Sequence, residues 1–245
     1  MKHCMPRYAA LVALGCSLVS SALFAEDAPK KPWSNSAEAS FLGTNGNTKT
    51  TTTGIKNDFS YKWPKYQLDL NAGGLGSSNK DKVTAERYFA GQKLAYNITE
   101  RFYGFERFHW DKDRFAGIRS RYETTGGLGY KFLNLPSHEW LTEVGSGYIW
   151  EERTIHTKNN FASGRAYTKY TYKISESSKF SQDFEYLHDY EDSDNFRMNT
   201  ESALIASLTN HLALKTSFKW NKVAKPPVGF VKNDTTTAVA LVVNY

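Results

Sequence analysis

The sequence has almost no cysteine. Of its 245 residues only Cys4 and Cys16 are cysteines, and both stand near the amino end. The chain after residue 16 therefore cannot form a disulfide, supply a thiolate nucleophile or bind a metal through sulfur. Six histidines are scattered along the chain, and His109 has nearby acidic residues, Asp111 and Asp113, in a segment interpreted below as a charged loop. We accordingly expect no metal site, no cofactor and no catalytic residue.

Long apolar runs are also missing. After residue 25 no segment reaches the 18 consecutive apolar residues that a transmembrane helix needs. The mean hydropathy is below zero, as in water-soluble proteins. This value does not exclude a transmembrane β-barrel, because every second residue of such a barrel faces a polar lumen.

The first 25 residues have the layout of an export signal. Lys2 and Arg7 form a basic start, residues 8–24 are an apolar run, and Ala25 precedes two acidic residues. This layout predicts a signal peptide over residues 1–25 and a single domain over residues 26–245. The sequence Leu14-Gly15-Cys16 offers a lipoprotein site as an alternative. It is disfavoured because the apolar run continues past the cysteine.

The charge balance is mildly basic. Removing Lys2 and Arg7 with the signal from a formal charge of +6 leaves about +4. This excess suits an anionic lipid surface better than nucleic acid, and an exported protein meets little nucleic acid.

Strand-like runs fill the rest of the chain. Turn residues such as Asn45-Gly46-Asn47, Trp63-Pro64 and Pro226-Pro227 separate them. The predicted strands are 34–43, 49–62, 65–76, 83–97, 101–111, 116–132, 138–152, 161–174, 178–190, 195–209, 211–222 and 234–245. No helical period competes with this pattern. We therefore predict an all-β fold, a transmembrane antiparallel up-and-down β-barrel of about 12 strands.

The predicted connections alternate in size. Connections two, four, eight and ten are tight, whereas three, five, seven and eleven are longer and more polar, and connection six, at residues 133–137, is slightly long for a turn. Short turns on the periplasmic side and longer loops outside are typical of outer-membrane barrels.

Charged residues keep to one face of the predicted strands. A Lys or Arg facing lipid near the midplane costs about 2–4 kcal/mol, so this face must point inward. The predicted lumen-lining residues are Arg119, Arg121, Glu123, Glu143, Glu151, Arg165, Lys169, Asp183, Glu185, Glu201, Lys215 and Lys219. Signs roughly alternate between neighbouring strands, which favours cross-strand ion pairs. Such pairs either close the interior or line a narrow, charge-selective pore. The run 101–111 has no clean face, so we expect a bulge or a misplaced boundary there.

The final strand has the clearest alternation. Val239, Leu241, Val243 and Tyr245 share one face, and the chain ends on an aromatic residue. A last strand of this kind resembles the signal that the barrel-assembly machinery reads in outer-membrane proteins.

A soluble barrel of the calycin or streptavidin kind would place its apolar residues inside. Aromatic residues distinguish the two possibilities, since they recur beside the connections at both predicted ends. Trp63, Tyr96, Phe102, Tyr130, Trp140, Tyr172 and Tyr245 stand at one end, and Trp110, Trp150, Tyr190 and Trp220 at the other. Two aromatic bands favour a membrane-spanning barrel.

Several motifs occur in an order that resembles a known family. They are Trp33, Ala37–Phe41, the turn Thr44-Asn45-Gly46-Asn47-Thr48, Ala85–Tyr88, Phe102–Gly104, Asp113–Phe115, Gly127–Tyr130 and Glu143–Tyr148. The chain resembles the salt-induced outer-membrane protein family, a domain of unknown function. The resemblance implies a barrel in the cell outer membrane and a link to salt stress. It supplies no substrate and no catalytic residue.

The sequence thus predicts a narrow channel or an envelope-integrity barrel, and not an enzyme. The alternatives are an outer-membrane lipase or protease and a structural barrel with a plugged lumen. Ser146 and His188 share the lipid-facing parity but lie on non-adjacent strands, which disfavours a catalytic pair. His109 with Asp111 and Asp113 is interpreted as a charged loop. A loop-based adhesin is disfavoured because the longest outer connection is short.

Predicted partners are outer-membrane lipid and lipopolysaccharide, the assembly machinery, and small solutes or ions. The outer connections carry cations that could meet lipopolysaccharide phosphates: Lys80, Lys82, Lys112, Arg114, Lys158, Lys222, Lys225 and Lys232.

Overall fold

The computed structural model describes residues 31–45, 50–79 and 82–245, and side chains are described except in residues 42–52 and 77–85. The expected signal peptide lies outside these residues. Pro32–Tyr245 forms one compact unit. Within the described residues no helix is long and apolar enough to cross a membrane.

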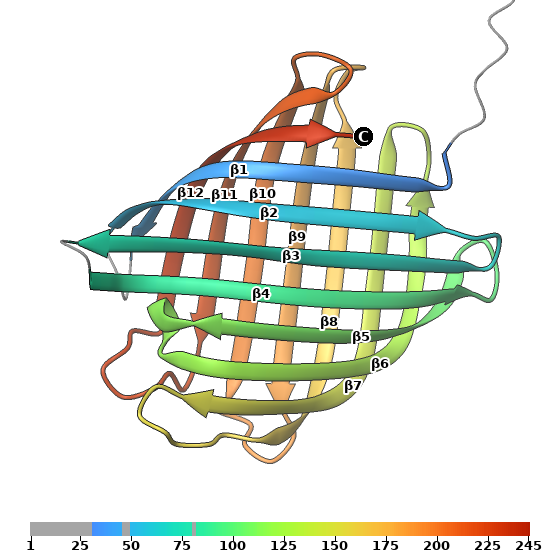
Figure 1. The fold of residues 1–245 in the computed structure, drawn as a ribbon. Coiled ribbons are helices and arrows are strands. Elements are labelled where there is room, and N and C mark those ends of the chain that lie inside the picture. Colours follow the sequence, from blue (N-terminus) through green and yellow to red (C-terminus); the bar gives the residue numbers. More distant parts are fainter. Residues whose placement is uncertain (1–30, 46–49, 80–81) are drawn as a thin grey trace, which may run out of the picture. The chain divides into compact units, whose positions relative to one another are not determined.

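Twelve strands make up this unit (Figure 1). They are β1 (Trp33–Asn45), β2 (Thr50–Lys62), β3 (Tyr66–Asn79), β4 (Lys82–Asn97), β5 (Phe102–Asp113), β6 (Ile118–Asn134), β7 (His138–Arg153), β8 (Phe161–Lys173), β9 (Ser178–Asp189), β10 (Phe196–Ser207), β11 (Leu212–Val223) and β12 (Asn233–Asn244). Each strand pairs antiparallel with the next, and β12 pairs with β1, so the sheet is a closed barrel. The predicted all-β barrel of about 12 strands is confirmed.

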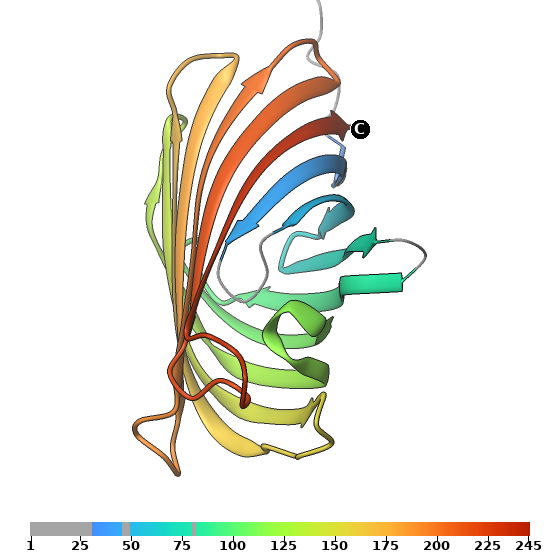
Figure 2. The same cartoon turned by 90° about the vertical axis from the view of Figure 1, so that its left-hand side faces the viewer.

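Two ends of the barrel differ in their connections. We call the end that carries the β2–β3, β4–β5, β6–β7, β8–β9 and β10–β11 connections, together with Trp33 and Tyr245, the short-turn end. The opposite end is the long-loop end, where the β7–β8, β9–β10 and β11–β12 loops lie close together (Figure 2). A 3₁₀ turn, η1 (Arg114–Ala116), lies in the β5–β6 connection, with the Asp113 side chain accepting a hydrogen bond from the Ala116 N–H.

Some predicted boundaries were wrong. The polar segment after residue 76 was expected to be a loop, but β3 continues to Asn79 and β4 begins at Lys82. The pairing of these strands shifts register between Ser77 and Ser78, which lets the polar residues extend the sheet. Similarly, β5 runs to Asp113, beyond the predicted end at residue 111, so the whole grouping of His109, Asp111 and Asp113 lies in a strand and not in a charged loop. A register shift between Asp111 and Asp113 gives the bulge expected in this strand.

The two faces of the sheet have opposite chemistry. Aliphatic and aromatic side chains are exposed on the outside, among them Phe41, Ile55, Leu128, Val144 and Leu204. Aromatic residues stand at both ends of this face, with Trp63, Tyr96 and Trp140 at the short-turn end and Tyr122, Trp150 and Tyr190 toward the long loops. An apolar face with aromatic residues at both ends suits contact with lipid. The closed sheet also pairs the backbone N–H and C=O groups, which have no water to bind within a lipid bilayer.

Glycines allow close approach on the inner face of β6. A Cβ on Gly129 would lie 2.2 Å from the Tyr103 ring, so only glycine lets this ring lie flat over β6. The position matters because the Tyr103 hydroxyl reaches the charged residues of the lumen, as described below.

Candidate functional site

The inner face of the barrel carries the charged residues. Register pairing places eleven of the twelve predicted lumen residues on this face: Arg121, Glu123, Glu143, Glu151, Arg165, Lys169, Asp183, Glu185, Glu201, Lys215 and Lys219. Arg119 does not lie on the inner face. It occupies the extra residue of a bulge between Ile118 and Ser120, is exposed, and donates to Glu152 at 2.9 Å.

One group of charges meets in the middle of the lumen, and we call Lys93, Glu143, Arg165 and Glu185 the central cluster. Glu143 is 1% exposed and accepts hydrogen bonds from Lys93, from Arg165 at 2.9 Å and from the Tyr103 hydroxyl at 2.8 Å. Arg165 also donates to Glu185 at 2.6 Å. Since β4 and β7 are separated by two strands, the Lys93–Glu143 pair crosses the inner surface and does not merely join neighbours.

A second group lies toward the long loops, and we call Asp111, Arg121, Glu151 and Arg197 the long-loop cluster. Glu151 accepts from Arg197 at 2.5 Å, and Arg121 donates to Asp111 at 2.9 Å and lies 3.9 Å from Glu151. Arg153 adds a further donor to Glu151 at 3.1 Å. The Glu151–Arg197 pair joins β7 to β10, again across two intervening strands.

Apolar side chains surround the long-loop cluster. Ile149 is fully buried, and Ile118, Phe161 and Leu187 are nearly so. The Arg197 guanidinium lies 5.8 Å from the centre of the Phe161 ring. Buried charges of this kind depend on their partners, because an unpaired ion in such surroundings costs several kcal/mol.

A third group joins the last strands to the first. Lys215 lies 3.4 Å from Glu38 on β1 and 3.1 Å from Glu201, which also pairs with Lys219 at 3.0 Å. Lys169 and Asp183 are directly opposite in register, and Asp183 accepts a hydrogen bond from the Glu201 backbone N–H at 3.1 Å.

Two hollows open on the lumen. One, of about 310 Å³, is bounded by the central cluster together with Asp69, Asn71, Arg107, His109, Tyr167, Asp183 and Asn199. The other, of about 320 Å³, lies at the short-turn end between the β6–β7 and β8–β9 turns, with Lys173 and Lys179 on its wall. The inner wall can therefore contact a solute at polar and charged positions.

Sequence reasoning missed several residues of these clusters. Tyr103, Arg107 and Asp111 were overlooked because β5 carries charged residues on both faces, with Glu106 on the outer one beside Gln92. On β4, Lys93 shares a face with Gly91 and Ala95. The alternation of side chains along this strand could therefore have predicted that Lys93 points into the lumen.

The residues that suggested an enzyme do not form a catalytic arrangement. Ser146 and His188 lie in one row on the outer wall with Gly164 between them. The Ser146 hydroxyl bonds to that of Tyr190 at 2.8 Å, and His188 Nδ1 lies 3.3 Å from the Tyr186 hydroxyl. Within the described part of the chain no group of three His, Cys, Asp or Glu side chains could hold a metal ion.

Cations near the long loops have varied surroundings. Lys112 and Arg114 pair with Glu86 on the outer wall, and Lys225 bonds to Asp192 at 2.5 Å. That hydrogen bond lowers the pKa of the Asp192 carboxyl. Lys80 lies outside the described residues.

Comparison with known proteins gives both a family and a set of similar folds. A family model described as a protein of unknown function, DUF481, matches residues 37–245. The chain is 29% identical over 202 residues to the uncharacterized protein YdiY of Escherichia coli strain K12, covering 81% of this chain and 77% of that one. The NanC porin has a similar fold, with a TM-score of 0.59, 9% identity and coverage of 84% of this chain and 98% of the porin. An outer-membrane channel from Pseudomonas putida F1 gives a TM-score of 0.53 at 11% identity, covering 89% and 97%.

Proposed function

The chain belongs to the DUF481 family of proteins of unknown function, and from this premise we propose that it is an outer-membrane β-barrel with a narrow polar passage for small solutes or ions. The family is the one that the sequence motifs indicated. The passage is inferred from the lumen of this chain, because similarity of fold alone does not define a function.

Membrane insertion follows from the distribution of side chains. The outer face exposes aliphatic residues between two aromatic bands, while most strand charges point inward. A soluble barrel would bury the aliphatic face and expose the charges, which is the reverse arrangement. The predicted export signal and the fold shared with outer-membrane channels support the outer membrane as the location.

One observation favours a passage over a solid interior: ion pairs join non-adjacent strands across the lumen, yet a hollow of about 310 Å³ remains beside the central cluster. Charged rings and constrictions of this kind select solutes by size and charge in known pores. The runner-up is a closed barrel that stabilises the envelope, and the buried long-loop cluster favours it.

Conductance of the refolded protein in a planar lipid bilayer tests the passage. We expect small, reproducible current steps, and a larger conductance for the double variant Glu151→Gln/Arg197→Gln, which removes one cross-lumen pair. Lys65→Gln is the control, since Lys65 is exposed in the β2–β3 turn and forms no ion pair with a described residue. If both the wild type and the double variant are silent while unboiled gels show a folded barrel, the closed barrel is correct.

We further propose that the protein is not an enzyme and that its passage supports the envelope during salt or osmotic stress, as the family resemblance implies. A deletion strain should grow more slowly at high salt and recover with the wild-type gene. Ser146→Ala should complement fully. Phospholipase or protease activity that this substitution abolishes would refute the proposal.

Lipopolysaccharide is the proposed lipid partner. Lys112, Arg114 and Lys222 lie on the outer wall or rim near the long loops, where the phosphates of that lipid would stand.

A further inference from the structure

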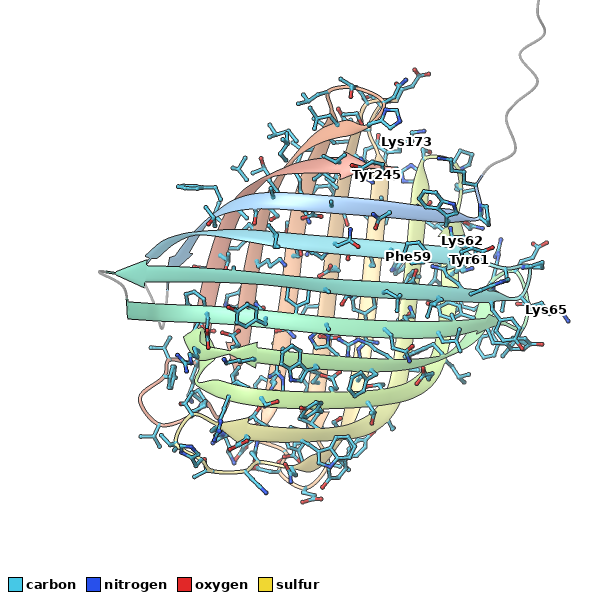
Figure 3. All side chains as sticks on the ribbon, in the orientation of Figure 1. Phe59, Tyr61, Lys62, Lys65, Lys173 and Tyr245 are labelled. Atoms are coloured by element: carbon cyan, nitrogen blue, oxygen red, sulfur yellow. The ribbon has the colours of Figure 1, made fainter. Side chains whose placement is uncertain are left out.

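We propose that the short-turn mouth of the lumen contains a binding site for small hydroxylated carboxylates, with Lys173 and Lys179 as the anion-binding groups. This inference rests on the proposed passage and names the class of solute that would enter it. The site lies at the same end of the barrel as Tyr245, and Figure 3 shows Lys62 and Lys173 at this end.

The two lysines face each other. Lys173 on β8 and Lys179 on β9 are directly opposite in register, on the inner face. Like charges directly opposite one another destabilise a sheet. Within the described residues neither lysine forms an ion pair, and both are exposed. Lys169 on the same inner face interacts with Lys179 as a further like charge, so an anion bound beside these ammonium groups would offset the repulsion.

The surrounding wall is shaped and polar. The hollow of about 320 Å³ that contains both lysines is also lined by hydroxyl groups, from Ser137, Thr171, Ser175, Ser177, Ser178 and Ser207. Hydroxyls and ammonium groups together can donate several hydrogen bonds to one carboxylate.

Two carboxylates on the same wall favour a ligand that has hydroxyl groups as well as a negative charge. Glu139 and Glu176 also line the hollow, and a simple inorganic anion would be repelled by them. A ligand that carries hydroxyl groups beside its carboxylate could donate those hydroxyls to Glu139 and Glu176. The wall therefore fits a hydroxylated acid better than either a halide or a neutral sugar.

Other lysines extend the positive surface into the barrel. Lys62, Lys131 and Lys169 share the inner face in the short-turn half, and none forms an ion pair with a described residue. Lys131 lies 5.6 Å from the centre of the Tyr103 ring, next to the central cluster. A low-dielectric wall focuses the field of such unpaired charges and raises the local concentration of anions.

Gluconate is the probe, with glucose and chloride as matched controls for its hydroxyls and its charge. At constant ionic strength, gluconate should raise the thermal midpoint of the refolded wild-type barrel, as any ligand of the folded state does. Lys173→Gln and Lys179→Gln should each weaken the apparent affinity by about tenfold, the order expected for one charge-assisted hydrogen bond. Lys65→Gln and the charge-conserving Lys179→Arg should keep the effect. Unboiled gel mobility establishes that each variant is folded.

Stabilisation by glucose or chloride equal to that by gluconate would overturn the proposal, as would unchanged affinity in both glutamine variants. Bilayer recordings separate this outcome from failure of the passage. A silent bilayer with gluconate stabilisation intact would refute the passage and keep the site. If the protein conducts but gluconate does not change its thermal midpoint, the binding site is refuted and the passage is kept.

Discussion

Two groups of charged residues, one toward each end of the lumen, differ in burial and in pairing. Toward the long loops, Asp111, Glu151 and Arg197 are buried and each has an oppositely charged partner. Toward the short turns, Lys173 and Lys179 are exposed and unpaired among the described residues. The same residue types therefore hold the barrel together at one end and remain available to solutes at the other. Burial and partners decide which role applies.

The largest expected effect is at the long-loop end. Glu151→Gln leaves the buried Arg197 and the half-buried Arg153 without their carboxylate, which should lower the free energy of unfolding by about 3–5 kcal/mol. Urea titration of the refolded barrel, followed by unboiled gel mobility, measures this change. Glu139→Gln is the matched control in the exposed half and should change stability by about 0.5 kcal/mol or less. Equal losses in the two variants would remove the distinction between the halves.

The central cluster tests where the paired region ends. Glu143→Ala and Arg165→Ala should each cost about 2–4 kcal/mol, because each leaves a charge with poorer compensation. The double variant should cost about 1–3 kcal/mol less than their sum. Denaturant unfolding of all three variants gives the coupling. If the losses in the two single variants add up to that of the double variant, water already screens the Glu143–Arg165 pair. The solvated part of the lumen would then extend through the middle of the barrel.

The carboxyl-terminal residue is part of the short-turn end without belonging to the lumen. Val239, Leu241 and Tyr245 are exposed on the outer face, and the Tyr245 backbone exchanges hydrogen bonds with Asn35 at 2.9 and 3.4 Å. Deleting Tyr245 removes both bonds, each worth about 1 kcal/mol. The sequence predicts that Tyr245, with Val239, Leu241 and Val243, forms the signal that the assembly machinery reads. If so, deleting Tyr245 should lower the yield of protein in the outer membrane several-fold. Membrane yield that follows stability alone would argue against such a signal.

The smallest expected effect has the opposite sign. Lys179→Gln removes repulsion from Lys169 and from Lys173 opposite, and should stabilise the ligand-free barrel by about 0.2–1 kcal/mol. Thermal unfolding at low salt measures this gain, which added salt should diminish. A loss of stability would show that Lys179 has a structural partner and that the short-turn half resembles the other one.

Alternation predicted the strands and most inward residues, because a barrel wall must separate lipid from water at every second position. It failed at Arg119, where a bulge turns the side chain outward. The bulge in β5 was indicated by its mixed faces, whereas charged and apolar residues alternate cleanly around Arg119, so nothing in the sequence of β6 indicated a bulge there. The contacts of Lys93 with Glu143 and of Arg197 with Glu151 were equally hidden. They join strands that are not neighbours, so they depend on the curvature of the barrel and on side-chain length.

Closure of the barrel between β1 and β12 constrains how the chain can reach its native state. Asn35 bonds to Tyr245 and β1 pairs with β12, so the ring cannot close until β12 has been synthesised and delivered. Joining ends about 200 residues apart costs about 5 kcal/mol of chain entropy, which no local contact offsets in advance. Until then β1 and β12 present open edges that invite pairing with other chains. A long-range encounter of this kind is expected to be slow, and the proposed outer-membrane location requires that both edges be shielded until β1 and β12 pair.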